Sequence, residues 1–84
     1  MAQTPEQTAA TRIRFLARHV DETDRNDTET SINLIYVIAS KAAAGVTDST
    51  NKFRYIADEC GRVDRADEKE AQKLLNLIRM IFGQ

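Results

Sequence analysis

The sequence predicts an all-α fold, a compact four-helix domain with a central apolar second helix and a short third helix. Three observations support this prediction. Apolar residues recur at helical spacing in four segments, residues suited to helix caps precede these segments, and residues 32–44 are apolar in almost every direction around a helix. We expect helices at about 5–20, 27–44, 48–60 and 65–82, and no strand.

The first helix is expected to begin with a capping box. Thr4 is suited to the N-cap, Pro5 to the first helical position, and Gln7 stands where its side chain can return to the cap. Phe15 lies off the apolar stripe, so it indicates either a broad buried face or a contact with a partner. The stripe itself consists of Ala9, Ile13, Leu16, Ala17 and Val20.

An acidic connector at about 21–27 is expected before the second helix, with Asp27 or Thr28 as its N-cap and Gly45 as a left-handed C-terminal residue. The apolar segment 32–44 is too short to cross a bilayer. A helix that is apolar on all sides cannot lie on a water-facing surface. We therefore expect it to be enclosed from every side, partly by a neighbouring molecule.

The third and fourth helices each show one apolar stripe. Residues 47–50 offer a cap for the third helix, which Gly61 is expected to end, and Asp64 or Asp67 can cap the fourth. Leu77 and Met80 broaden the last stripe beyond a third of the helix circumference. The stripes are Phe53, Ile56, Ala57 and Cys60 in the third helix, and Ala71, Leu74, Leu75, Ile78, Ile81 and Phe82 in the fourth.

We expect residues 1–84 to form a single helical domain without an internal repeat. A chain of this length buries only about 60 to 65% of its unfolded surface, so association with a second copy would stabilise it. The lone Cys60 and the absence of a secretory signal or a membrane-spanning segment predict a cytoplasmic location.

The predicted function is that of a small protein–protein interaction module of the adaptor or inhibitor type, acting as a homodimer and also binding another protein. The second and fourth helices present more apolar surface than two short neighbours can cover. Aromatic residues, methionine and arginine are favoured at interfaces. The candidate partner-binding residues are Arg14, Arg18, Leu34, Tyr36, Leu77, Met80, Ile81 and Phe82.

No enzyme activity, metal site or cofactor is expected. His19 and Cys60 both fall near helix ends, but nothing in their sequence context pairs them as base and nucleophile. A calcium loop starting at Asp24 would need glycine where Glu29 stands and glutamate where Ile35 stands. The three glycines form no phosphate-binding loop.

The alternative function is a helix-turn-helix-like DNA-binding regulator that uses residues 38–56. The turn at 44–50 resembles that motif, and Lys52 and Arg54 would contact DNA. Lys41 and Asn51, however, put polar side chains at the two positions where the motif's helices pack together. With a net charge of −1 the chain also lacks the positive field that attracts DNA, so nucleic acid is not the expected partner, and neither is a membrane.

Overall fold

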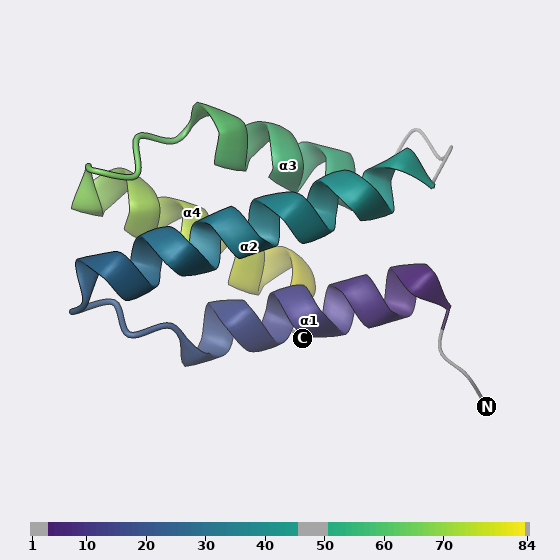
Figure 1. The fold of residues 1–84 in the computed structure, drawn as a ribbon, viewed down its shortest axis with the longest axis horizontal. Coiled ribbons are helices and arrows are strands. Elements are labelled where there is room, and N and C mark those ends of the chain that lie inside the picture. Colours follow the sequence, from purple (N-terminus) through teal and green to yellow (C-terminus); the bar gives the residue numbers. More distant parts are fainter. Residues whose placement is uncertain (1–3, 46–50, 84) are drawn as a thin grey trace.

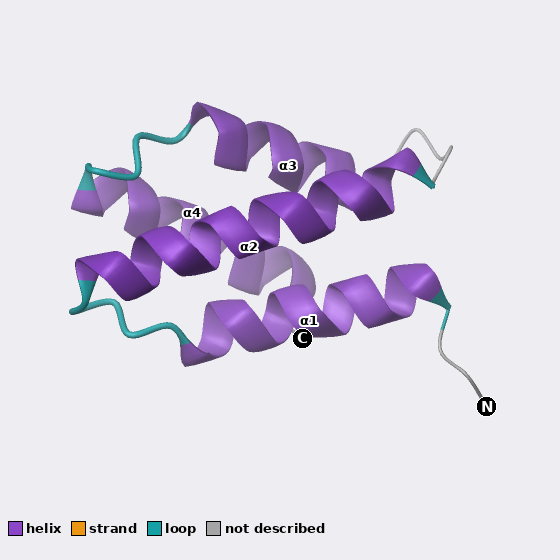
Figure 2. Cartoon of the chain, viewed as in Figure 1, coloured by secondary structure: helices purple, strands orange, loops and turns teal. Residues whose placement is uncertain are grey.

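A computed structural model describes residues 4–45 and 51–83, and these form four α-helices without a strand (Figures 1 and 2). The helices are α1 (Pro5–His19), α2 (Arg25–Ala44), α3 (Lys52–Arg62) and α4 (Glu68–Phe82). The predicted all-α fold and the short third helix are thus confirmed. The structure spans 37 × 25 × 19 Å.

The longest helix, α2, is the centre of the arrangement. It lies between α1 and α3 in Figure 1, with α4 behind it, and it contacts each of the other three helices. Its most extensive contact is with α3, while α4 packs mainly against α1. Across the described residues α1 and α3 make no contact, so α2 and α4 join the two halves of the core.

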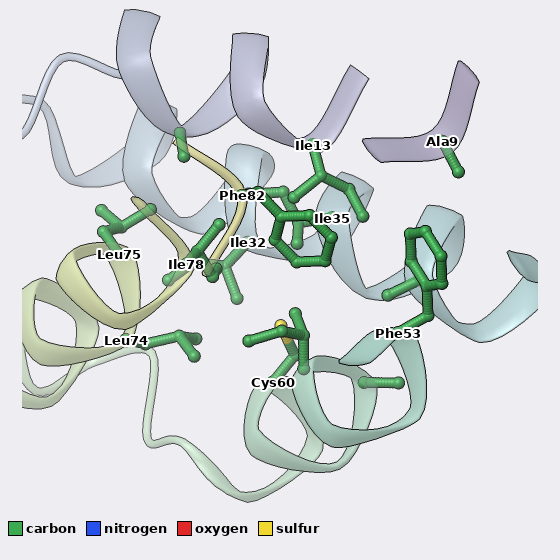
Figure 3. Close-up of a cluster of buried hydrophobic side chains, with 14 of the residues drawn as sticks. Ala9, Ile13, Ile32, Ile35, Phe53, Cys60, Leu74, Leu75, Ile78 and Phe82 are labelled. Atoms are coloured by element: carbon green, nitrogen blue, oxygen red, sulfur yellow. The ribbon is translucent and has the colours of Figure 1, made fainter. Parts of the chain in front are cut away.

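The core is formed by one stripe from each helix, as the periodicity predicts. Figure 3 shows these side chains converging between the four helices. The rings of Phe53 and Phe82 lie 5.5 Å apart between centroids, so the last turn of α4 docks against the first turn of α3. The fully enclosed side chains are Ile13, Ile32, Ile35, Ile56, Cys60, Leu75 and Ile78.

The helix starts agree with the predicted caps in two cases and differ in one. Thr4 and Gln7 form the expected capping box, and Asp67 caps α4. The expected cap of α2 at Asp27 or Thr28 is wrong. The N-cap is Asp24, whose side chain accepts hydrogen bonds from the amides of Asn26 and Asp27. Residues 25–27 are therefore the first turn of α2, and the acidic connector is shorter than predicted.

Gly45 caps the end of α2 as expected but is not left-handed, and Gly61 does not end α3. Gly45 follows α2 with φ of −94°, and its amide donates to carbonyls of the preceding turn, so no left-handed residue is needed. Gly61 lies inside α3, because the amide of Val63 still bonds to the carbonyl of Glu59. At the start of α3 the cap is Asn51; the expected cap at 47–50 lies outside the described residues.

The connectors that join α1 to α2 and α3 to α4 are built in the same way. In each, an aspartate accepts a hydrogen bond from the amide two residues later, and a second aspartate caps the next helix. A carboxylate in the first helical turn reaches back to the amide of the first aspartate, at 2.7 Å in one connector and 3.0 Å in the other. The matching residues are Asp21, Asp24 and Asp27 in the first, and Asp64, Asp67 and Glu70 in the second.

The spacing that relates the two connectors also relates several buried residues of the α1–α2 hairpin to residues of the α3–α4 hairpin. Asp64 follows Asp21 by 43 residues, and the same offset relates buried positions of α1 to α3 and of α2 to α4. The two hairpins are nevertheless not equivalent, because α1 packs extensively on α2 whereas α3 and α4 contact each other little. The expectation of no internal repeat stays a prediction. Most residues that are 43 positions apart differ in type and share only their burial. The buried pairs include Ile13 with Ile56, Ala17 with Cys60, Ile32 with Leu75, and Ile35 with Ile78.

The first connector has a threonine hydroxyl hydrogen bond that the second lacks, and this bond leads to a pH-dependent prediction. The hydroxyl and amide of Thr23 donate to Asp21, and these hydrogen bonds hold the pKa of Asp21 below 3.8. A lowered native pKa stabilises the fold above the unfolded pKa, and this contribution is lost as pH falls through the native pKa. We expect Thr23→Val to raise the pKa of Asp21, as followed by NMR titration of its carboxyl group. An unchanged pKa would contradict the assigned cause.

The expectation that α2 is enclosed on every side is not met within one chain. Leu34, Tyr36 and Val37 keep 46%, 41% and 48% of their surface exposed. The neighbouring helices are too few to surround α2, because α1 and α3 flank it and α4 covers a single further side. Enclosure of the remaining side by a second molecule stays a prediction.

Candidate protein-binding groove

An apolar groove runs between α1 and α2 on the side of α2 that the chain leaves open. It consists of two adjoining hollows of about 310 and 540 Å³ that share Arg12, Leu34 and Ile38. We call it the α1–α2 groove. Its lining residues are Pro5, Thr8, Ala9, Thr11, Arg12, Phe15 and Leu16 of α1, and Leu34, Val37, Ile38, Lys41 and Ala42 of α2.

The groove exists because the apolar surface of each helix extends past its buried stripe. Leu16 and Ile38 are half-buried at the α1–α2 contact, and Leu34 and Val37 continue the apolar surface outward on α2. On α1, Phe15 is 61% exposed and its ring stacks on His19 with centroids 4.3 Å apart. The exposed ring of Phe15 therefore forms one wall of the groove, and the ring of His19, one turn later, packs against it.

The charged side chains that line the groove are both cations, Arg12 and Lys41. Both are exposed; Arg12 lies where the two hollows meet, and Lys41 lines only the hollow that includes Pro5. The groove that faces α3 and α4 differs in character, because Glu59, Arg62, Glu70 and Lys73 contribute charges of both signs. An apolar floor with few charges is typical of the central part of a protein interface.

The structure distributes the predicted partner-binding residues over several surfaces. Leu34 lines the α1–α2 groove, whereas the ring of Tyr36 lies on the α3 side, 3.9 Å from the position of a Cβ at Gly61. Met80 is 72% exposed on α4, with Leu77 and Ile81 half-buried beside it. These residues do not form one continuous site.

Phe82 is the exception, because it belongs to the core and not to a surface. Its ring packs on Phe53, and the ammonium group of Lys52 lies 4.9 Å from its centroid. Placing Phe82 among the partner-binding residues was therefore wrong. Its ring is buried against the first half of α3, a contact that the position of Phe82 near the end of the sequence did not reveal.

The predicted arginine contacts, Arg14 and Arg18, lie outside the groove. They are one turn apart on α1, and neither lines the two hollows. The arginine that lines the groove is Arg12, which was not predicted as a contact. Val37 and Lys41 were not predicted either, whereas Phe15 was considered a possible partner contact. Their signal was the off-stripe position of Phe15 together with the unusually broad apolar surface of the second helix.

His19 and Cys60 are not brought together as a catalytic pair. His19 is exposed and stacked on Phe15, whereas Cys60 is completely buried in the core. Burial raises the pKa of the Cys60 thiol to about 11, so the thiol is protonated at neutral pH. The structure thus places Cys60 among the small core residues.

This burial predicts that native Cys60 resists alkylation. We expect iodoacetamide at pH 8 to modify the folded chain far more slowly than the chain in urea, because the thiolate is scarce and the sulfur is enclosed. Mass spectrometry of timed samples measures both rates. Similar rates in the two conditions would show that the thiol is accessible in the folded protein.

Residues 4–45 and 51–83 contain neither a metal-binding cluster nor a membrane-spanning helix. In that part of the chain, His, Cys, Asp and Glu side chains form no group of three or more that could hold a metal ion. Within the same residues, every helix is either too short or too polar to traverse a bilayer.

The DNA-binding alternative stays a prediction, although the geometry of its two helices is partly visible. α2 and α3 lie side by side along much of their length (Figure 1), whereas the helices of a helix-turn-helix cross at about 90–120°. Arg54 and Lys52 are both exposed, and the ammonium group of Lys52 also lies over the rings of Phe53 and Phe82. The turn itself, residues 46–50, lies outside the described residues.

Comparisons of the chain with protein-family models, with curated proteins and with solved structures found no match.

Proposed function

We propose that this chain is a non-enzymatic protein–protein interaction module of the adaptor or inhibitor type that acts as a homodimer. The observation that carries the proposal is the α1–α2 groove, in which Phe15, Leu34 and Val37 each keep about half or more of their surface exposed. Apolar residues gathered in one place on a small protein mark a surface that another molecule covers.

The composition of the groove fits a protein partner better than a small charged ligand. Its charges are confined to Arg12 and Lys41, and its floor is built of aliphatic side chains from two antiparallel helices. From Pro5 to Leu16 the groove is about 16 Å long at the rise of an α-helix, which is the length of three helical turns. A helix of a partner would match this shape.

Burial of this surface would also stabilise the fold. A chain of 84 residues has a small core, and covering exposed apolar area contributes about 25 cal/mol per Å². A second copy of the chain supplies such cover without another gene product, and two-fold dimers are the commonest soluble assemblies.

Sedimentation equilibrium over a range of concentrations tests the proposal. We expect a mass that approaches twice the 9.5 kDa of one chain at tens of micromolar, with dissociation on dilution. Binding of an apolar dye should fall as the dimer fills. A mass of one chain at every concentration, without dye binding, would overturn the proposal.

A further inference from the structure

The stripe of α2 that borders the groove is charged at its two ends and apolar in its middle. Asp27, Leu34 and Lys41 are spaced seven residues apart, so they lie nearly in line along two turns on either side of Leu34. Val37 extends the apolar middle, and both Leu34 and Val37 are exposed. The stripe is therefore acidic at one end and basic at the other.

This polarity distinguishes the two ways in which α2 can pair with the α2 of a second copy. In a parallel pair, Lys41 would face Lys41 and Asp27 would face Asp27, which is repulsive at both ends. In an antiparallel pair around Leu34, each Lys41 faces the Asp27 of the other copy. Charge complementarity thus favours the antiparallel order.

The acidic end of the stripe can accept such a contact. Asp27 is half-buried and uses its Oδ2 atom to accept the hydrogen bond from the amide of Asp21. A carboxylate offers two oxygens and several lone pairs, so an ammonium group can be added beside that hydrogen bond. Lys41 is exposed at the opposite end.

Resting on the homodimer proposed above, we infer that the second copy docks in the α1–α2 groove with the two α2 helices antiparallel, Leu34 near the two-fold axis, and Lys41 of each copy against Asp27 of the other. Phe15 and Leu16, at the height of Leu34 in the groove, then form the apolar centre with Leu34 and Val37. Asp27 and Lys41 lie at the rim, as charges do in most interfaces, whereas Arg12 lies beside Leu34 where the two hollows meet.

The corresponding surface of the second hairpin is the less suitable one. Met80 corresponds to Val37 and Leu77 to Leu34 by the offset of the two hairpins. In the adjoining hollow, however, Glu59, Arg62, Glu70 and Lys73 surround Leu77, and these charges would have to be desolvated. Met80 therefore provides a matched control at an equally helical and even more exposed position.

The first arm of the test compares Leu34→Asp and Val37→Asp with Met80→Asp by sedimentation equilibrium. Because all three residues are exposed, we expect each variant to keep its helical circular dichroism. Leu34→Asp and Val37→Asp should weaken dimerisation at least about thirtyfold, as expected for central contacts, whereas Met80→Asp should leave it nearly unchanged.

The second arm measures the order of the helices with a spin label at Ala44→Cys, an exposed residue at the end of α2. Buried Cys60 leaves the new thiol as the reactive one. Antiparallel pairing around Leu34 separates the backbones at residue 44 by about 30 Å, whereas parallel pairing places them at the helix spacing of about 8–10 Å. The long distance supports the inference, and the short one overturns it.

The outcomes separate this inference from the proposal on which it rests. A wild-type chain that stays monomeric overturns this inference and the homodimer on which it rests. If such a chain also fails to bind the apolar dye, the proposed interaction module is overturned as well. A wild-type dimer that survives Leu34→Asp but dissociates with Met80→Asp preserves the homodimer and overturns its placement in the α1–α2 groove.

Discussion

Replacing Ile35 by alanine is expected to lower the free energy of unfolding by about 2–5 kcal/mol, a large part of the total for a domain of this size. Ile35 is completely buried in the middle of α2, where it meets the core stripes of the other helices (Figure 3). Removing its outer carbons loses apolar burial and leaves a cavity that the surrounding packed helices cannot readily close. Urea denaturation followed by circular dichroism measures the change.

Two comparisons make this result specific to the core. Ile78 occupies the corresponding position in the second hairpin and is equally buried, so Ile78→Ala should cost a similar amount. Met80→Ala removes a side chain of comparable size that is 72% exposed, and it should change the free energy of unfolding by less than about 0.5 kcal/mol. A loss below 1 kcal/mol for both isoleucines would contradict the packing described for the core.

The sequence was sufficient to predict the helices because their signals are local. The apolar stripes that the periodicity predicted for α3 and α4 are the buried residues of those helices, except that Ile81 is half-buried. The capping box at Thr4 depends on residues three positions apart, and it was recognised for the same reason. Boundaries were less accurate where several caps compete, as at Asp24 and Asp27, because the choice depends on hydrogen bonds across the whole connector.

The groove could be anticipated only in part, because it depends on which helices become neighbours. The surplus of apolar surface on α2 was visible in the sequence, but its division into a side facing α1 and a side facing α3 was not. Tyr36 and Leu34 therefore seemed to belong to one surface. The position of Phe82 depended likewise on the start of α3, which lies far away in the sequence.

The likeness of the two connectors was not apparent from the sequence, because they share hydrogen bonding more than residue identity. The residues shared by both connectors are Val-Asp followed by Asp three residues later, at Val20 and again at Val63. These few letters become significant only when both aspartates are seen to accept the same amide hydrogen bonds.

Arg79→Met is expected to lower the free energy of unfolding by about 1–2 kcal/mol, because Arg79 links α4 to the end of α1. Its Nε donates to the carbonyl of Ala17 at 2.9 Å, and its Nη1 donates to the carboxylate of Glu22 at 2.8 Å. Hydrogen bonds that involve a charged group contribute more than neutral ones, but the side chain is about a third exposed and water moderates the gain. Methionine keeps the length of the side chain and removes every donor.

Arg62→Met is the matched control for that substitution. Arg62 pairs with Glu59 within α3 at 3.7 Å, and its side chain is mostly exposed, so its loss should cost less than about 0.5 kcal/mol. Glu22→Gln separates the two contacts of Arg79, because it removes the ion pair and leaves the Ala17 carbonyl bonded. If Glu22→Gln costs as much as Arg79→Met, the ion pair alone would account for the effect. A smaller cost would assign most of it to the carbonyl that Arg79 satisfies at the α1–α4 contact.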